Sequence, residues 1–220
     1  VYDSNSNKVV VLYAVSNTIR SFVGTVSGKN ISFGAPTTHT IIGQSVTEKS
    51  LRVVFDTNLN KIVVSYVEYN HGDRLARAMV GTISGTTISF GSAAYLEESS
   101  YGTRGISLTF DPISNKVLAF YHPLDSSKAR VKVGTVSGTS ISFGSFTQFP
   151  FTGGARDIAS VYDPDSNKTV VLYRRDSAAR AIIATVSGTS VSFGTEYQIT
   201  ASDIGEFPAV TYDTYSNKVV

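Results

Sequence analysis

Charged residues recur at one position of a repeated pattern, seven residues before each of a series of aspartates. The residues at this position are Lys49, Arg104, Arg156 and Glu206. Guanidinium groups bind carboxylate, sulfate and phosphate through paired hydrogen bonds, so cations that converge here could hold an anion. The alternative is that basic residues at the ends of loops are simply solvated, and the sequence leaves both open.

Aromatic residues suggest a second kind of binding site. Tyr95, Phe149 and Tyr197 each follow the last strand pattern of a repeat. Rings at equivalent places could stack on sugars. This pattern is compatible with a lectin that has one shallow site in each repeat or between repeats.

Catalytic groups form no recognisable constellation. The histidines are His39, His71 and His122, and they share no motif. A glycosidase needs two carboxylates, or a tyrosine with a carboxylate, and Tyr101 near Glu97 and Glu98 is the best candidate set. Cysteine, a phosphate loop, a nucleophile elbow and metal-ligand spacing are all absent from the sequence. We therefore expect no enzyme, no catalytic residue, no cofactor and no metal.

The aspartates belong to a motif, aromatic-Asp-x-x-x-Asn-Lys, that recurs about every fifty residues. Its aspartates are Asp3, Asp56, Asp111, Asp163 and Asp213. Alternating oxygen side chains in three copies resemble a calcium loop, but the loop glycine and the distant acidic ligand are missing. We expect a structural turn in which the aspartate accepts backbone N–H bonds.

A second motif, of the form Gly-Thr-Val-Ser-Gly-Thr-Ser-Ile-Ser-Phe-Gly, alternates with the first. It spans residues 24–34, 81–91, 134–144 and 184–194. An arginine precedes it by four residues in each copy, at Arg20, Arg77, Arg130 and Arg180. Because a binding site would normally treat one repeat differently from the next, we expect these arginines to tie neighbouring repeats together.

Each repeat contains four strand patterns joined by turns suited to antiparallel pairing. We predict an all-β fold, a β-propeller of four-stranded antiparallel blades with a repeat of about 50 residues. Residues 1–220 would form a single β-propeller array, with three complete blades, partial blades at both ends, and continuation in a longer chain. A closed four-bladed ring is the alternative, but residues 213–220 would then duplicate residues 3–10.

The turns that contain the two motifs are nearly uniform, whereas the other connections vary. The variable segments are 14–18, 67–75, 122–128 and 174–179 between the second and third strands, and 36–49, 92–103, 145–155 and 195–206 between repeats. Variable loops on a repeated scaffold often carry binding specificity, although drift explains them equally well. If a site exists, we expect it among these segments.

Composition excludes some partners. The formal net charge is +2 and the basic residues are scattered, which does not favour nucleic acid. No apolar run approaches the length of a membrane span.

The two motifs together resemble a β-propeller repeat found in long, repetitive proteins of marine phages, bacteria and some aquatic eukaryotes. The resemblance covers the whole chain and implies a tail-fibre, adhesion or surface protein, extracellular or on a virion. The repeat is distantly similar to the Asp-box and FG-GAP propellers, but it lacks the Asp-box tryptophan and a complete calcium loop. We expect a non-enzymatic structural or adhesive protein that binds a glycan or protein partner, or further repeats of its own chain or of other copies. A lectin is the alternative, and a sialidase-like glycoside hydrolase using Arg104 and Arg156 is less favoured.

Overall fold

The computed structural model describes residues 1–41, 43, 45–47, 50–97, 102–201 and 208–220. All regular structure in these residues is β, and every strand pair is antiparallel, which confirms the predicted all-β class. No helix within these ranges could cross a membrane. The chain divides into two compact units, Val1–Gly102 with Val136–Ser142, and Thr103–Thr135 with Phe143–Val220.

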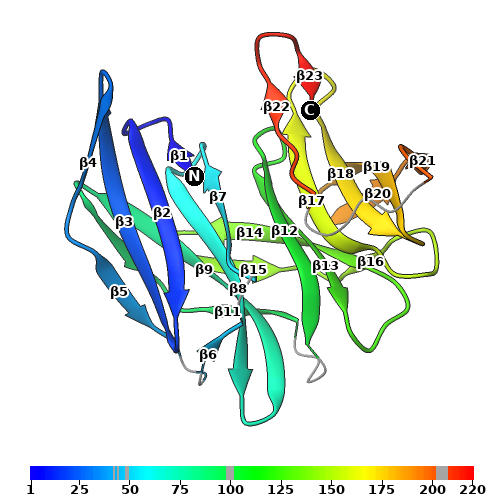
Figure 1. The fold of residues 1–220 in the computed structure, drawn as a ribbon, viewed down its shortest axis with the longest axis horizontal. Helices are drawn as coiled ribbons and strands as arrows, with labels where there is room; N and C mark the ends of the chain where they lie inside the picture. The colour runs from blue at the N-terminus through cyan, green and yellow to red at the C-terminus, as the bar shows by residue number, and fades with distance from the viewer. Residues whose placement is uncertain (42, 44, 48–49, 98–101, 202–207) are drawn as a thin grey trace. The chain divides into compact units, whose positions relative to one another are not determined.

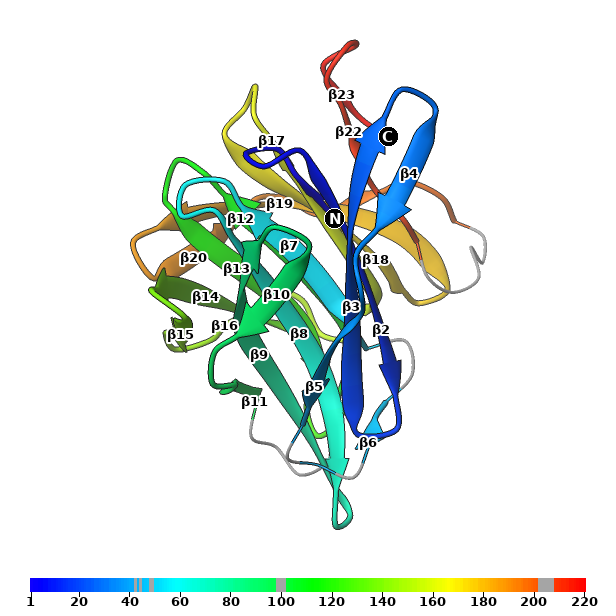
Figure 2. The same ribbon diagram turned by 90° about the vertical axis from the view of Figure 1, so that its left-hand side faces the viewer.

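The first unit contains two sheets, each built around a long hairpin (Figures 1 and 2). In the first sheet the order is β1 (Tyr2–Asp3), β2 (Lys8–Val15), β3 (Thr18–Ser27) and β4 (Asn30–Phe33), with β5 (Thr37–Thr40) also on β3. In the second, β8 (Lys61–Asn70) and β9 (Asp73–Ser84) form the hairpin. Strands β6 (Ser45–Val46) and β7 (Arg52–Asp56) pair with β8, and β10 (Thr87–Phe90) and β11 (Ala94–Glu97) pair with β9.

The remaining strands follow the same plan. The third sheet has the order β12 (Thr103–Asp111), β13 (Lys116–Pro123), β14 (Arg130–Ser137) and β15 (Ser140–Phe143), with β16 (Thr147–Gln148) on β14. The fourth has the order β17 (Arg156–Asp163), β18 (Lys168–Arg175), β19 (Ala178–Ser187) and β20 (Ser190–Phe193), with β21 (Tyr197–Gln198) on β19. Strands β22 (Tyr212–Asp213) and β23 (Lys218–Val219) pair with each other.

The repeated turns are built alike. Each motif aspartate accepts hydrogen bonds from two backbone N–H groups, as Asp111 does from Ile113 at 3.0 Å and Ser114 at 3.1 Å. The motif asparagine has a positive φ of 54–56° in all five copies, a conformation that asparagine tolerates. In the first three repeats the motif lysine donates to the threonine of the second motif, as Lys116 Nζ does to Thr135 Oγ1 at 3.0 Å. This contact joins the two motifs at one end of each of the first three sheets.

The variable connections are shorter than the sequence suggests. Segments expected as loops after the fourth strand contain β5, β11, β16 and β21, so the outer edge of each sheet is split into two short strands. The split falls at a glycine whose N–H still bonds to the long strand, as Gly34 does to Val23 O at 3.1 Å. The second and third strands are also longer than their apolar runs, which leaves two-residue turns at Ser16–Asn17, His71–Gly72 and Asp176–Ser177.

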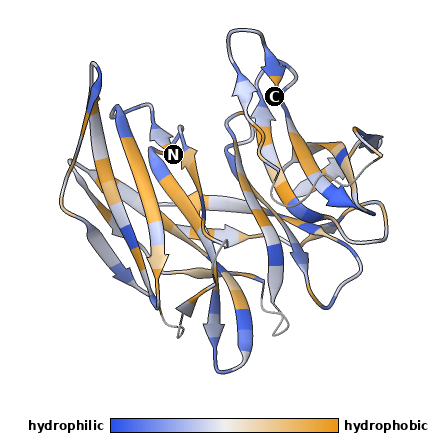
Figure 3. Ribbon diagram, in the orientation of Figure 1, coloured by the Kyte–Doolittle hydropathy of each residue, from blue (hydrophilic) through white to orange (hydrophobic). Residues whose placement is uncertain are grey.

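Successive sheets within a unit share one apolar core, and the same two faces meet in both units. In the first unit Val10 of β2 lies in a buried cluster with Tyr66 of β8. In the second unit Leu118 of β13 lies in a buried cluster with Tyr173 of β18. Val10 and Leu118 stand second after the motif lysine, and the two tyrosines stand fifth. Figure 3 shows the hydrophobic residues along β2 and β8.

Candidate functional site

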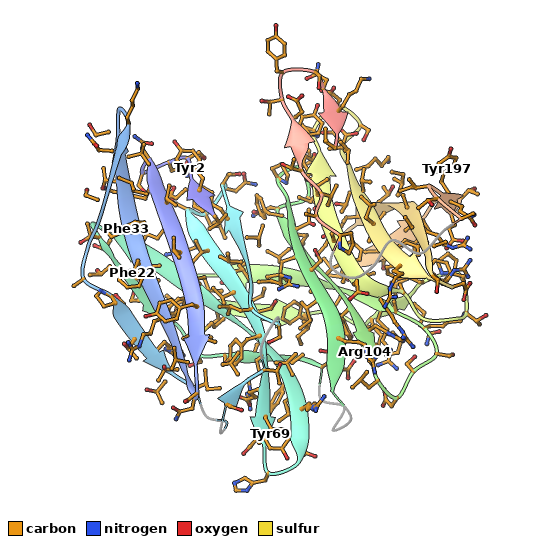
Figure 4. The ribbon with its side chains drawn as sticks, viewed as in Figure 1. Tyr2, Phe22, Phe33, Tyr69, Arg104 and Tyr197 are labelled. Atoms are coloured by element: carbon orange, nitrogen blue, oxygen red, sulfur yellow. The ribbon has the colours of Figure 1, made fainter. Side chains whose placement is uncertain are left out.

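Arg104 and Arg156 line one pocket of about 260 Å³ in the second unit. Arg104 lies at the start of β12 and Arg156 is the first residue of β17, and both are exposed (Figure 4 labels Arg104). These two strands lie side by side, joined by a 2.8 Å hydrogen bond between Ser107 Oγ and Ser160 Oγ. The structure thus brings together two of the four charged positions singled out by the repeat.

A β-bulge follows each of these arginines. The register of β12 on β13 shifts after Arg104, and the register of β17 on β18 shifts after Arg156. Gly105 and Asp157, the residues directly after them, have φ values of 65° and 51°. The bulges pack closely, because a Cβ on Gly105 would lie 3.1 Å from the backbone N of Asp157. Bulges redirect side chains at sheet ends, and here they set the positions of the two arginines.

His122 lines the same pocket and is only 8% exposed. It is the partner of Arg104 in the β12–β13 ladder. Its Nε2 lies 3.0 Å from the carbonyl oxygen of Ser126, so Nε2 carries the proton and donates. Gly154 packs on the ring, since a Cβ there would lie 2.7 Å from Cε1, and its N–H donates to Ser127 O at 3.0 Å. These contacts hold the β13–β14 loop against the segment that precedes β17.

The pocket is positively charged. Its described lining contains no carboxylate. Asp157 is paired with Arg174, Nε to Oδ2 3.1 Å, whereas Arg104 and Arg156 have no ion-pair partner among the described residues. Burial lowers the pKa of His122; the hydrogen bond to the loop carbonyl opposes this, and the charges of Arg104 and Arg156 lower it further. At neutral pH the ring is therefore uncharged and the two guanidinium groups supply the charge.

The other predicted binding residues are not brought to this pocket. Lys49 and Glu206 lie outside the described residues. Tyr95 lies on β11, where its hydroxyl accepts a 3.0 Å hydrogen bond from Arg77 Nη2 and its ring faces the Arg77 guanidinium carbon at 4.0 Å. Tyr197, on β21, is 70% exposed (Figure 4).

Phe149 is a correction to the expected aromatic set. Its side chain is 0% exposed and lies in the core of the second unit, with its ring centroid 4.7 Å from that of Phe193 and 5.7 Å from that of Tyr173. A ring packed in this way cannot stack on a ligand. Because Tyr95 is paired with an arginine and Tyr197 is exposed, the three aromatics have no common environment to form one sugar site per repeat.

Three of the four recurrent arginines contact different residues of their own repeats, whereas the sequence led us to expect contacts between neighbouring repeats. Arg77 forms a buried ion pair with Glu68 on the adjacent strand. Arg180 Nη1 lies 2.9 Å from Glu196 Oε2, and the guanidinium carbon of Arg130 lies 4.1 Å from the Phe146 ring centroid. Arg20 is exposed on β3. Arg130 and Arg180 contact the segment that follows their own edge strand, and Arg77 contacts both Tyr95 in that segment and Glu68 on the neighbouring hairpin strand.

The calcium-like and catalytic candidates have other environments. The motif aspartates Asp3, Asp56, Asp111, Asp163 and Asp213 accept backbone N–H bonds in their turns. Among the described residues no group of three or more His, Asp or Glu could hold a metal ion. Glu98 and Tyr101 lie outside the described ranges, and Glu97 is 9% exposed on β11. The His39 ring lies 5.3 Å from that of Phe90, and His71 occupies the β8–β9 turn.

Sequence reasoning missed His122 as part of a site. It follows the tyrosine that recurs in the second strand of every complete repeat, where the other repeats have Ala14, Val67 and Arg174. That difference between repeats is the signal in the sequence that could have identified His122.

No protein-family model matches the chain, and no curated protein matches its sequence.

Proposed function

We propose that the protein is a non-enzymatic adhesive β-propeller of an extracellular or virion surface, and that its pocket at Arg104 and Arg156 binds an acidic glycan. The observation that carries the proposal is that two guanidinium groups line one pocket. Among the described residues, neither group has an ion-pair partner and no carboxylate lines the pocket. Planar guanidinium groups recognise carboxylates in a bidentate manner, which suits a uronic or other sugar acid.

The propeller interpretation rests on how the sheets are built and packed. The first, third and fourth sheets are four-stranded antiparallel meanders in sequence order with the fourth strand split in two, and the second differs in that its first strand is also split, into β6 and β7. In both units, the sheet face that carries the second residue after the motif lysine packs on the face of the next sheet that carries the fifth residue after its own motif lysine. Meanders stacked in this manner are the blades of propellers. The uniform motif turns would then be scaffold, and the variable connections at the other end of each sheet would carry recognition.

The pocket size restricts the ligand. A volume of about 260 Å³ is just below the range of about 300–1,000 Å³ found for small-molecule sites, so it accommodates one charged sugar unit rather than a long oligosaccharide. Exposed guanidinium groups are partly screened by water and salt, so a single site would bind in the millimolar range. Adhesion would then depend on several sites acting together, because multivalency multiplies weak affinities.

The experiment is a titration monitored by NMR with glucuronate and with glucose, two sugars that differ by one carboxylate. We expect glucuronate to shift the signals of the pocket residues and glucose to leave them unchanged. Arg104→Gln and Arg156→Gln should each weaken glucuronate binding about tenfold, which corresponds to about 1.4 kcal/mol. Arg20→Gln is the matched control, because it removes the same charge from an exposed position of the first unit.

Four results would contradict the proposal. Equal binding of glucose and glucuronate would show that the pocket does not recognise the carboxylate. Unchanged affinity in both pocket variants would place the site elsewhere. Turnover of an acidic glycoside that is lost in Arg104→Gln would show an enzyme instead of an adhesin. Binding of an acidic peptide in preference to glucuronate would favour a protein partner.

A further inference from the structure

One side of the anion pocket is formed by a segment that cannot hold its own shape. Gly153 and Gly154 line the pocket and have φ values of 99° and 62°. Glycine has no side chain to pack and loses more conformational freedom on ordering than any other residue. The order of this segment must therefore come from contacts made by its neighbours. We call residues 151–154 the pocket wall.

The side chain of Arg175, the last residue of β18, contacts three consecutive residues of the pocket wall. Its Nη1 donates to the carbonyl oxygen of Thr152 at 3.0 Å, and its guanidinium carbon lies 4.4 Å from the centroid of the Phe151 ring. A Cβ on Gly153 would lie 3.9 Å from Arg175 Cδ. A guanidinium group can donate along its edge and stack through its face at the same time. Arg175 uses both capacities on the wall.

Glu196, which follows β20, fixes the guanidinium group of Arg175. Its Oε2 accepts from Arg175 Nη2 at 2.6 Å and from Arg180 Nη1 at 2.9 Å, and its Oε1 accepts from the Tyr173 hydroxyl at 2.6 Å. The side chains of Arg175 and Glu196 are 16% and 18% exposed. Charge-assisted hydrogen bonds are stronger than those between neutral groups. The fourth sheet thus holds Arg175 in one orientation against the wall.

The pair of Arg175 and Glu196 occurs in one repeat. Arg175 stands seventh after the motif lysine, and Glu196 stands second after the glycine that ends the second motif. The other repeats have Val15, Glu68 and Pro123 at the first position, and Pro36, Ala93 and Phe146 at the second. A contact that only built the common scaffold would recur. This pair is instead present where the connection from the preceding repeat lines the pocket.

We propose that Arg175 is a positioning residue of the anion pocket, which acts by holding the pocket wall in place. Arg175 does not itself line the pocket. It acts through Gly154, which packs on the His122 ring and donates to Ser127 O at 3.0 Å. Without Arg175 the wall should loosen, and the pocket beside Arg104 and Arg156 should lose its shape. The effect on affinity rests on the proposed binding of an acidic glycan, whereas the effect on the wall does not.

The test compares Arg175→Gln with Arg180→Gln. Each substitution removes one positive charge and one bond to Glu196 Oε2. Among the described residues, however, the guanidinium group of Arg180 contacts Glu196 and no residue of the wall. In the protein without ligand, Arg175→Gln should speed hydrogen exchange of the Gly154 amide and shift the NMR signals of the His122 ring. Arg180→Gln should leave both unchanged.

Glucuronate titration gives the second measurement. Arg175→Gln should weaken binding about fivefold, less than the loss of a guanidinium group in the pocket itself, and Arg180→Gln should weaken it less than about twofold. Arg175→Lys keeps the charge, but one ammonium group cannot replace the two bonding nitrogens and the stacked plane of arginine. It should therefore give exchange rates and affinity between those of Arg175→Gln and the wild type.

The results separate the positioning role from the proposed function. If the wild type does not bind glucuronate, the proposed function fails, and hydrogen exchange still tests the wall. Unchanged exchange at Gly154 in Arg175→Gln overturns the positioning role. Equal effects of Arg175→Gln and Arg180→Gln would also overturn it, because they would reflect general weakening of the fourth sheet. So would wild-type affinity in Arg175→Lys despite faster exchange at Gly154, since charge alone would then matter.

A second variant reaches the same wall without changing any charge. Phe151→Leu removes the ring on which Arg175 stacks and retains the ion pairs of Glu196. It should also speed exchange at Gly154 and weaken glucuronate binding. This variant decides the matter if Arg175→Gln does not fold, which circular dichroism would show. Exchange and affinity that both remain at wild-type values in Phe151→Leu would then contradict the inference.

Discussion

At the scale of single residues, the protonation of His122 is linked to the charge of the pocket. Its ring is buried, its Nε2–H is bonded to Ser126 O, and its Nδ1 has no hydrogen-bond partner among the described residues. A protonated ring would lie in the field of Arg104, Arg156 and Arg130. The neutral ring is therefore favoured in the free protein. A bound anion would offset this repulsion and raise the pKa of His122 again.

This linkage predicts opposite pH responses of affinity and stability. As pH falls from about 7.5 to about 5.5, affinity for glucuronate should rise, because protonation of His122 adds a third positive charge. The folded-state pKa lies below the usual 6.5, so the unfolded chain takes up the proton first. The stability contribution of His122 is therefore present above about pH 6.5 and is lost as pH falls through the folded pKa.

Calorimetric titration at several pH values checks the affinity, and urea unfolding checks the stability. His122→Asn should remove both pH responses relative to the wild type. His71→Asn is the control, because His71 lies exposed in the β8–β9 turn at a φ of 49° that asparagine also tolerates. Affinity that is independent of pH in the wild type would separate His122 from anion binding.

Residues governed by local hydrogen bonds could be predicted from the sequence, and residues governed by distant contacts could not. The turn role of Asp111 and the positive φ of Asn115 follow from neighbours within a few positions. The environment of His122 depends on Gly154, more than thirty residues later in the chain. The burial of Phe149 likewise arises from another sheet. Nothing in the local pattern around either residue indicates these contacts.

At the scale of elements, strand identity was predictable from alternation and turn chemistry, but strand ends were not. The strands extend to Val15 and Thr18 because main-chain pairing continues past the apolar run into the turn. The bulges after Arg104 and Arg156 were also unpredicted, although Gly105 is a residue type that tolerates one. These bulges matter for the proposed anion site, because Arg104 and Arg156 directly precede them and line one pocket.

A comparison of two glycine substitutions should separate the bulge from ordinary backbone strain. Gly105 and Gly188 have φ values of 65° and 61°, so alanine incurs a similar backbone cost of about 1–2 kcal/mol at each. A Cβ at Gly188 meets nothing within 4 Å, whereas at Gly105 it meets the backbone of Asp157 at 3.1 Å. We expect Gly105→Ala to lose more stability in urea unfolding and also to weaken glucuronate binding. Gly188→Ala should leave the binding unchanged. Equal affinities in the two variants would mean that the bulge does not position the arginines.

At the scale of the whole molecule, the chain is a series of similar sheets, and within each unit two successive sheets share a core. The repeat of about fifty residues and the antiparallel meander were visible in the sequence because both depend on motifs that recur. Which sheet faces are covered was not visible, since Val11 and Val64 occupy identical positions in the pattern but are 42% and 0% exposed. In arrays of this type, stability is approximately a sum of repeat and neighbour contributions. Damage to one core should therefore remain local.

Phe149 provides the test of that locality. Truncation of this buried ring in Phe149→Ala should reduce the free energy of unfolding of the second unit by about 3–5 kcal/mol. In hydrogen exchange the amides of β13, β14, β18 and β19 should lose protection, while those of β2 and β8 in the first unit should keep theirs, because the Val10–Tyr66 cluster contains no residue of the second unit. Phe146→Ala is the matched control, since Phe146 is 44% exposed and should change stability by less than about 0.5 kcal/mol. Equal loss of protection in both units would show that the chain unfolds as one cooperative whole, and an effect of Phe149→Ala no larger than that of Phe146→Ala would contradict the core position of Phe149.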